Sequence, residues 1–475
     1  MPEGVLFDLP GLLHACNPGW RAPGGTAQPT PVAHAERLSR QLLADAAPAA
    51  ALVEGSRQTG KSTLLDAVAE RLLAELPAAT AVCRLRLADT PLRWCEVDAI
   101  YAAWQAASPC TGRHFLLIDD VDLWSAERQG ELIALVHRTG VQLLVACTRP
   151  GSLPDLLLRS GRSPTRVHLR PANFAEFLAF HGQPAPLPVA PQSLRLLFDW
   201  SAAHFRELGD GLRPLQLQFL RYLAHGGYPG ARTAASPEAA QRYLREEVVT
   251  RHLRWDAPAC DGVRRGSELE LTLAYLAARS GSLLDIPDLC AHLSVERPTA
   301  RQFITLLESM GLLQRIAPLG YGHQVRRARF LICLADPALP AALLWQSISD
   351  PQVLECAGHH ALQRHLRGAY ATRGAEIRFA TIKPQQHTLI VGAGAQCLPF
   401  ALQFAPRRSR ARDFGAVARL CTEHGVARAY LATRLGEDIG PLNDMPAAGP
   451  AVMRVPLALL CLWLSAAEPD GFNAG

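Results

Sequence analysis

One glycine-rich stretch, residues 55–63, constrains this chain more than any other part of it. It reads Gly-Ser-Arg-Gln-Thr-Gly-Lys-Ser-Thr and fits G-x-x-x-x-G-K-[ST], between a short apolar run and an amphipathic helical pattern. In such a stretch, backbone N–H groups turn inward onto phosphate oxygens at the positive end of the following helix. The residues expected to bind a nucleoside triphosphate are therefore Gly55, Ser56, Arg57, Gln58, Thr59, Gly60, Lys61, Ser62 and Thr63.

Two side chains of this stretch have specific chemical roles. We expect Lys61 to reach the β- and γ-phosphates and the Ser62 hydroxyl to bind Mg²⁺. The chain contains only two lysines, Lys61 and Lys383, and its other basic residues, histidines aside, are arginine. A lysine is thus kept where phosphate binding calls for a compact, flexible ammonium group.

Composition places the chain among ordinary globular proteins. With 475 residues, of which 49% are hydrophobic and 19% charged, we expect about three or four domains with ample cores. The net charge of +5 permits a nucleic-acid partner without requiring one. The first residues lack the pattern of a secretory signal, and the apolar run 455–467 contains Pro456 and is too short to span a bilayer. The cysteines form no C-x-x-C pair, so we expect reduced thiols, a cytoplasmic location and no membrane partner.

The first third of the chain alternates between apolar segments and helical patterns. Besides the run before the glycine-rich stretch, strands are expected at 80–87, 114–118, 141–147 and 165–169. This alternation predicts an α/β fold with a doubly wound parallel sheet, which binds ligands at the carboxyl ends of its strands.

Polar residues follow two of these strands. Asp119 ends the strand at 114–118, where a carboxylate can hold the Mg²⁺ shell together with Ser62. Thr148 ends the strand at 141–147, where a side chain can sense the γ-phosphate or the attacking water. Together these features resemble the additional-strand class of P-loop ATPases, to which the AAA proteins belong.

The residues that the resemblance implies for hydrolysis match the usual pattern of the class less closely. The class usually has a glutamate where this chain has Asp120, and the shorter side chain could slow hydrolysis because a base must come within hydrogen-bond reach of its proton. Arg162 and Arg149 are candidates for the arginine that neutralises charge on the transferred phosphoryl group, and each could equally be a surface arginine. Asp122 is expected to be a helix cap or a surface carboxylate.

The remaining chain divides into three expected domains after an ATPase core at 1–172. Residues 173–262 show helical patterns typical of a lid. Residues 263–345 show three helical stretches and a hairpin, which is the order of a winged helix-turn-helix. Residues 346–475 return to an α/β pattern without a second P-loop.

Short motifs spread along the chain extend the resemblance. They are Asn17-Pro18-Gly19-Trp20, the glycine-rich stretch, Gly161-Arg162, Pro171-Ala172-Asn173-Phe174, Gly226-Gly227-Tyr228-Pro229 and Leu334-Ala335-Asp336-Pro337. In this order they resemble prokaryotic AAA-type ATPases with a C-terminal winged helix and a restriction-endonuclease-like domain of unknown function.

The last domain of that family resembles a PD-(D/E)xK nuclease. Metal-assisted cleavage there needs two carboxylates and a lysine. At the corresponding positions, after Glu376, this chain has Arg378, Ala401 and Gln403. The resemblance therefore implies an endonuclease-like fold that has lost its activity and serves for binding or packing.

A winged helix can lay its third helix in the major groove and its wing on the DNA backbone. The candidate phosphate contacts are Arg297, Arg301, Arg326, Arg327 and Arg329, with a second basic run at Arg407, Arg408, Arg410 and Arg412. The alternative to DNA contact is that the winged helix packs on the ATPase core, on a protein partner or on a second copy of the chain. His359, His360 and His365 are expected to be solvated or capping histidines rather than metal ligands.

Three hypotheses for the function remain. The leading one is a cytoplasmic ATPase, using ATP and Mg²⁺, whose nucleotide state repositions the lid and the winged helix and acts on a catalytically silent last domain. The second is a nucleotide-stabilised scaffold that binds DNA or protein with little turnover, which Asp120 in place of glutamate favours. An ATP-dependent nuclease ranks last.

Overall fold

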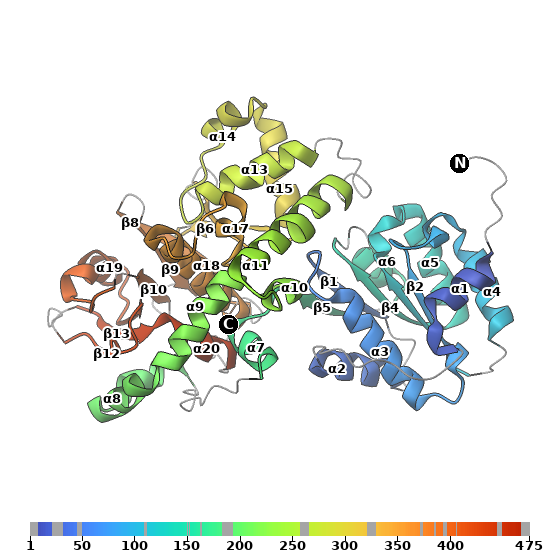
Figure 1. Cartoon of the computed structure of the whole chain (residues 1–475), viewed down its shortest axis with the longest axis horizontal. Helices are drawn as coiled ribbons and strands as arrows, with labels where there is room; N and C mark the ends of the chain where they lie inside the picture. Colours follow the sequence, from blue (N-terminus) through green and yellow to red (C-terminus); the bar gives the residue numbers. More distant parts are fainter. Residues whose placement is uncertain are drawn as a thin grey trace. The chain divides into compact units, whose positions relative to one another are not determined.

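The computed structural model divides the chain into two compact units (Figure 1). Unit 1 comprises Met1–Arg170 with Arg254–Arg264, and unit 2 comprises Pro171–Leu253 with Arg265–Gly475. The residues that the structure describes are 8–20, 32–44, 50–108, 112–149, 151, 153–161, 164–182, 193–256, 266–320, 329–370, 374–383, 386–392, 397–404, 406–443 and 449–466.

Unit 1 is built on a five-stranded parallel sheet. Its strands are β1 (Ala50–Gly55), β2 (Val82–Arg86), β3 (Phe115–Asp119), β4 (Gln142–Cys147) and β5 (Thr165–Leu169). The strand order is β2-β3-β4-β1-β5, and every neighbouring pair is parallel. The sequence-based expectation of an α/β fold with a parallel sheet is therefore confirmed. Strand β4 lies between the strand that ends at Gly55 and the strand that ends at Asp119.

Helices cover both faces of this sheet, and its central strands β1, β3 and β4 are buried on both sides. Leu117 and Leu144 belong to the core under α2 (Val32–Leu43) and α3 (Lys61–Glu75). Their neighbours Leu116 and Leu143 point to the opposite face. The helices on that face are α1 (Leu9–Cys16), α4 (Val97–Ala107), α5 (Ala126–Thr139) and α6 (Leu153–Arg159) (Figure 1).

Unit 2 begins with helices, as the patterns after residue 172 predict. They are α7 (Phe174–Phe180), the 3-10 helix η5 (Leu194–Asp199), α8 (Ala202–Gly211), α9 (Arg213–His225), α10 (Pro229–Arg232) and α11 (Pro237–Tyr243). The chain continues from α11 through the π-helical segments Leu244–Thr250 and His252–Asp256. Ser201 caps α8 by accepting a hydrogen bond from the His204 N–H, so α8 begins as a helix separate from η5.

Three helices and a hairpin follow in the expected order. They are α13 (Gly266–Ala278), α14 (Ile286–Leu293), α15 (Arg297–Ser309), β6 (Leu313–Pro318) and β7 (Leu331–Leu334), followed by α17 (Leu339–Leu344). β6 pairs antiparallel with β7 and also runs parallel to β8, with Ala317 opposite Arg378. The hairpin is therefore part of an eight-stranded sheet of order β12-β13-β11-β10-β9-β8-β6-β7.

The last part of the chain supplies the rest of that sheet. Its elements are α18 (Pro351–Tyr370), β8 (Ile377–Lys383), β9 (Gln386–Val391), β10 (Leu398–Gln403), α19 (Ala411–Glu423), β11 (Arg428–Thr433), β12 (Gly440–Pro441), β13 (Ala451–Pro456) and α20 (Leu457–Ala466). One hydrophobic core joins the early helices, the hairpin, α18 and α20, and includes Phe177, Tyr222, Leu331, Leu362 and Leu460. The three expected domains after residue 172 thus pack as one unit.

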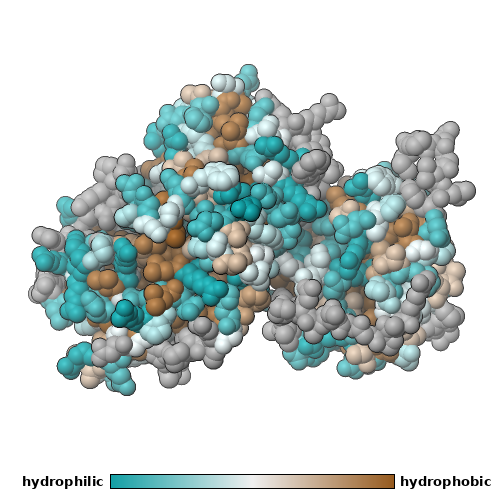
Figure 2. Space-filling model, viewed as in Figure 1, coloured by the Kyte–Doolittle hydropathy of each residue, from teal (hydrophilic) through white to brown (hydrophobic). Residues whose placement is uncertain are grey.

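Most large apolar side chains of the described residues are buried. Hydrophilic residues cover much of the face of unit 2 shown in Figure 2, with hydrophobic residues in smaller areas between them. In the described part of the chain, no helix combines the length and the apolar character needed to cross a membrane.

Candidate functional site

The glycine-rich stretch forms a tight loop between β1 and α3. Gln58 and Gly60 both have a left-handed backbone, with φ of 63° and 94°. A Cβ atom on Gly55 would lie 2.4 Å from the Leu169 carbonyl oxygen and 2.8 Å from Thr59 Oγ1, so only glycine fits there. The Thr59 hydroxyl donates to the Ser56 carbonyl at 2.8 Å and fixes the loop from within.

The amino-terminal end of α3 has no capping side chain. Its N-cap residue is Gly60, and the first turn contains no acidic residue. The first N–H groups of a helix have no partner within the helix, and together they make this end positive. Such an end is chemically suited to a phosphate group.

Lys61 is the buried cation of the loop, with only 7% of its surface exposed. Its Nζ donates to the carbonyl oxygens of Gly55 at 2.9 Å and Ser56 at 3.1 Å. A third contact, at 3.3 Å, joins it to Thr148 Oγ1 at the end of β4. Two of the expected site residues, Lys61 and Thr148, are therefore in direct contact.

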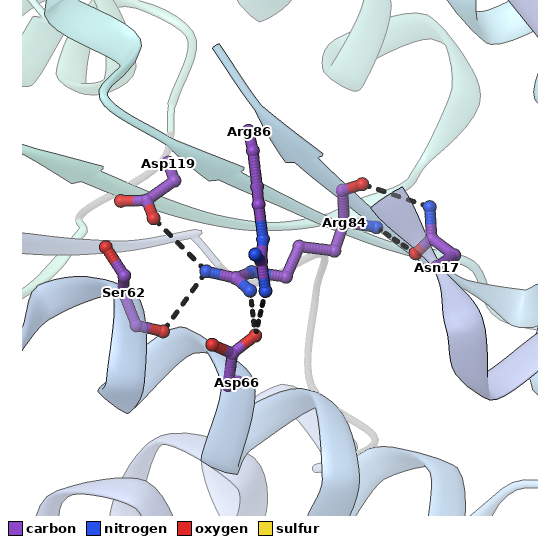
Figure 3. Close-up of polar contacts among 6 residues, drawn as sticks. All are labelled: Asn17, Ser62, Asp66, Arg84, Arg86 and Asp119. Carbon is purple, nitrogen blue, oxygen red and sulfur yellow. Dashed lines mark hydrogen bonds and ion pairs between the residues drawn. The ribbon is translucent and has the colours of Figure 1, made fainter. Parts of the chain in front are cut away.

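Asp119 lies at the end of β3 and is also buried, with 4% of its surface exposed. Its Oδ2 accepts a hydrogen bond from Arg84 Nη2 at 3.1 Å. The same nitrogen donates to the Ser62 carbonyl at 3.1 Å, so one guanidinium joins the two expected magnesium ligands (Figure 3). Oδ1 of Asp119 has no hydrogen-bond partner among the described residues. A buried carboxylate oxygen without a donor fits the coordination shell of a hard cation such as Mg²⁺.

Asp120 and Asp122 continue from β3 toward the same region. Asp120 has a left-handed backbone with φ of 56°. Burial and the neighbouring Asp119 raise the pKa of Asp120 to about 7, and the Lys61 charge opposes this shift. Burial also raises the pKa of Asp122, whose Oδ2 accepts the backbone N–H groups of Thr148 at 3.1 Å and Arg149 at 3.2 Å. The expectation of a helix cap or a surface carboxylate at Asp122 is wrong, because this side chain fixes the end of β4.

The two arginine candidates have different outcomes. Arg162 lies outside the described residues. Arg149 is described, and its backbone N–H binds Asp122. Neither residue is assigned a role on phosphate by these contacts.

Two charged residues near the loop escaped the sequence analysis. Glu54, one residue before Gly55, is buried, and its Oε1 accepts a hydrogen bond from Arg166 Nε of β5 at 2.6 Å. Arg84, in the middle of β2, is 3% exposed, and burial lowers its pKa to about 10. A charged residue within a buried strand was the available signal for both.

The Asn17–Trp20 motif binds the free edge of β2. Asn17 Nδ2 donates to the Arg84 carbonyl at 3.0 Å, and the Arg84 N–H donates to Asn17 Oδ1 at 2.7 Å. Trp20 Nε1 donates to the Val82 carbonyl at 2.8 Å. The motif thus satisfies backbone groups that an edge strand would otherwise leave unpaired.

Three further motifs of the sequence meet in unit 2. Ala172 N–H donates to the Gly227 carbonyl at 2.7 Å. Asp336, fully buried, accepts the N–H groups of Gly227 at 2.7 Å and Ala338 at 2.9 Å. We call Ala172, Gly226, Gly227 and Asp336 the glycine junction.

The basic residues of the expected winged helix fall into three groups. Arg297 and Arg301 lie exposed on α15. Arg329 forms an ion pair with Asp285, which precedes α14. Arg326 and Arg327 lie outside the described residues.

The positions that correspond to the nuclease carboxylates and lysine lie on β8 and β10. Arg378 pairs with Glu376 at 2.6 Å, and Ala401 is buried in a core with Phe414. Gln403 ends β10. Over the residues that the structure describes, no group of three or more His, Cys, Asp or Glu side chains could hold a metal ion.

Two of the three histidines of α18 are buried and bonded. His365 Nε2 accepts the Phe174 N–H at 3.0 Å, so it caps α7, one of the two roles expected from the sequence. His360 donates from Nδ1 to the Cys356 carbonyl at 2.6 Å. Burial lowers the pKa of His365 to about 3 and that of His360 to about 4. The expectation of a solvated or capping histidine is therefore confirmed as a cap at His365 and is wrong at His360, which is buried.

Comparisons with known proteins add little to this geometry. A family model described as a domain of unknown function (DUF8612) matches residues 216–350, which include Gly227 and Asp336 of the glycine junction. No curated protein matches the chain. Among solved structures, the chain is similar to a chain in the structure titled "Structure of Drosophila ORC bound to DNA". The two are 16% identical, the match covers 70% of this chain and 90% of that chain, and the TM-score is 0.27. A similarity at this TM-score supports no conclusion about fold or DNA.

Proposed function

We propose that unit 1 binds ATP with Mg²⁺ and hydrolyses it. The observation that carries this proposal is the convergence of Lys61, Thr148 and Asp119 around the glycine-rich loop, at the carboxyl ends of three parallel strands. In a parallel sheet this edge is the usual ligand-binding edge. The uncapped end of α3 at Gly60 adds positive potential at the same place.

Binding would use the backbone N–H groups of the loop and the side chain of Lys61. The N–H groups of the loop and of the first turn of α3 would donate to phosphate oxygens, and Lys61 would exchange the Gly55 and Ser56 carbonyls for phosphate. Ser62 Oγ and Asp119 Oδ1 would hold Mg²⁺, which when bound supplies neutralisation of phosphate charge.

Hydrolysis would depend on residues beside that pocket. Asp120 follows Asp119 and is the candidate group for orienting the attacking water. Thr148, which contacts Lys61 and is fixed through its N–H by Asp122, would bind the γ-phosphate or that water. We further propose that the protein is a cytoplasmic ATPase. Exchange between the ATP-bound and ADP-bound states of unit 1 would change the conformation of unit 2.

Equilibrium binding of a fluorescent ATP analogue to the full chain tests the proposal. We expect binding that is strengthened by Mg²⁺ in the unaltered protein and weakened at least tenfold in Lys61→Ala. The matched control is Lys383→Ala, which removes the other lysine of the chain. Lys383 ends β8 in unit 2, which is not expected to bind the nucleotide. Equal binding by both variants, or no binding by the unaltered protein, would refute the proposal. Phosphate release in the same samples separates hydrolysis from binding alone.

A second candidate function is a nucleotide-stabilised DNA-binding scaffold. It is favoured by the exposed face of α15, where Arg297 and Arg301 lie one turn apart. Phosphate contacts would make the affinity fall with salt. We expect an Arg297→Ala/Arg301→Ala double variant to bind duplex DNA more weakly at 50 mM salt if this function exists, and to behave as the unaltered protein if it does not.

A further inference from the structure

Arg84 is placed between the two residues that would hold Mg²⁺. Its Nη2 lies 3.1 Å from Asp119 Oδ2 and 3.1 Å from the Ser62 carbonyl (Figure 3). Its Nη1 forms an ion pair with Asp66, one turn further along α3. A planar guanidinium can donate to several fixed acceptors at once, and here it joins β3 to the first turns of α3.

The backbone of Arg84 is fixed as firmly as its side chain. Asn17 binds both its N–H and its carbonyl at the open edge of β2, and β3 covers the other edge with Leu117 opposite Arg84. Trp20 binds Val82 two residues earlier. The Arg84 side chain therefore extends from a backbone position that is fixed by Asn17 on one edge of β2 and by β3 on the other.

The contacts of Arg84 leave one oxygen of Asp119 available to bind a cation. Asp66 is 42% exposed and forms ion pairs with both Arg84 and Arg86, so Asp119 is not the only carboxylate that compensates the Arg84 charge. Asp119 uses only Oδ2 toward Arg84, and its Oδ1 is buried and without a hydrogen-bond partner among the described residues. One oxygen of Asp119 is thus held, and the other keeps its lone pairs for a cation.

We propose that Arg84 is a positioning residue for the divalent cation, a role that rests on the proposed binding of Mg²⁺ with a nucleotide. It fixes the rotation of the Asp119 carboxylate and its separation from Ser62, and the Asn17–Trp20 motif fixes Arg84 in turn. Groups that orient metal ligands from behind typically change metal affinity 10- to 100-fold when removed.

The test compares nucleotide binding with and without the metal. A fluorescent ATP analogue is titrated into the full chain in excess Mg²⁺ and again in EDTA, and Mn²⁺ binding in the presence of ADP is followed by electron paramagnetic resonance. Arg84→Met should keep the affinity measured in EDTA, which depends on the loop and Lys61. It should lose at least tenfold of the strengthening by Mg²⁺ and of the Mn²⁺ affinity.

Two variants distinguish positioning from a loss of folding. Arg86→Met removes a neighbouring arginine of β2 whose side chain also pairs with Asp66, at 3.3 Å. The backbone of Arg86 lies opposite Asp119 in the β2–β3 ladder, but the described contacts include no hydrogen bond or ion pair from its side chain to Asp119, so this variant should bind Mg²⁺ and nucleotide normally. Arg84→Lys keeps the positive charge but loses the planar guanidinium that donates to several acceptors. Compared with Arg84→Met, it should restore part of the strengthening of nucleotide binding by Mg²⁺. Circular dichroism confirms that each variant is folded. If Arg84→Met unfolds the protein, Asn17→Ala should show a smaller loss in the same direction, and an unchanged metal effect there overturns the inference.

The outcomes separate the two proposals. An unaltered protein that binds no nucleotide overturns both. If the unaltered protein shows the metal effect and folded Arg84→Met shows it equally, only the role of Arg84 is wrong. A folded Arg84→Met with stronger Mn²⁺ binding would mean that Arg84 competes with the cation, which also overturns the inference.

Discussion

The glycine junction allows the cost of losing one buried carboxylate to be worked out. Asp336 is fully buried, and its two oxygens each accept one backbone N–H, from Gly227 at 2.7 Å and from Ala338 at 2.9 Å. Asp336→Ala leaves both donors without that acceptor. A hydrogen bond to a charged group contributes about 1.5–3 kcal/mol, so two of them amount to about 3–6 kcal/mol.

A second effect reduces this sum. Burial raises the pKa of Asp336, which shows that the ionised carboxylate is destabilised where it lies, although Arg364 partly offsets this. Asp336→Ala removes that unfavourable contribution together with the hydrogen bonds. We therefore expect a net loss of about 2–4 kcal/mol in the free energy of unfolding. Asp336→Asn keeps one acceptor oxygen and should cost less.

Asp350 supplies a matched control. Its Oδ1 also accepts two backbone N–H groups, from Gln352 at 2.8 Å and Val353 at 3.3 Å, but it is exposed at the start of α18. Asp350→Ala should cost about 1 kcal/mol, as the loss of a helix cap does. The assay is urea unfolding, combined with hydrogen exchange of the Gly227 amide. A cost for Asp336→Ala no larger than for Asp350→Ala, with Gly227 still protected, would refute the reasoning.

Three further predictions follow from single contacts. Gly227→Ala should destabilise unit 2 by ~3 kcal/mol in urea unfolding, since its Cβ would lie 2.2 Å from the Ala172 carbonyl oxygen. Trp20→Phe should cost ~1 kcal/mol through the lost bond to Val82 and speed hydrogen exchange in β2; unchanged exchange there would contradict it. His365, with its pKa lowered from 6.5 to about 3, stays neutral in the folded chain while the unfolded chain takes up protons. The contribution of His365 to stability should therefore be fully present well above pH 6.5 and fall by up to ~1.4 kcal/mol per pH unit below it. Burial lowers the pKa of His360 as well, so His365→Gln should reduce, without abolishing, the slope of urea midpoints measured from pH 7 to 5.

Local patterns were enough to predict the elements of unit 1. The strand expected at 114–118 is found at Phe115–Asp119, and the one expected at 165–169 is found at those residues. The first is an apolar run that ends in Asp119 and is buried on both faces, and the second alternates, with Val167 and Leu169 buried and Arg166 and His168 exposed. The glycine-rich loop was predictable for a similar reason, because few residues tolerate its backbone.

Contacts between distant segments could not be predicted in the same way. The parallel pairing of β6 with β8 joins Ala317 to Arg378 across about sixty residues, and no periodicity in either segment specifies it. The role of Asp122 was predicted wrongly because its partners, Thr148 and Arg149, follow the next strand along the chain, β4. Arg84 has no motif of its own, so its contact with Asp119 became visible only when both strands were placed in one sheet.

The three buried aspartates of the described residues differ in how many hydrogen bonds their oxygens accept, and this difference supports the proposed ligand role of Asp119. Asp336 has one donor on each oxygen. Asp438 receives the N–H and hydroxyl of Ser409 on Oδ2 and a guanidinium nitrogen of Arg454 on Oδ1. Asp119 receives Arg84 on Oδ2 and, among the described residues, no donor on Oδ1. A buried oxygen without a partner costs about 1–3 kcal/mol, whereas both oxygens of Asp336 and Asp438 are satisfied. The cation proposed beside Ser62 would offset that cost at Asp119.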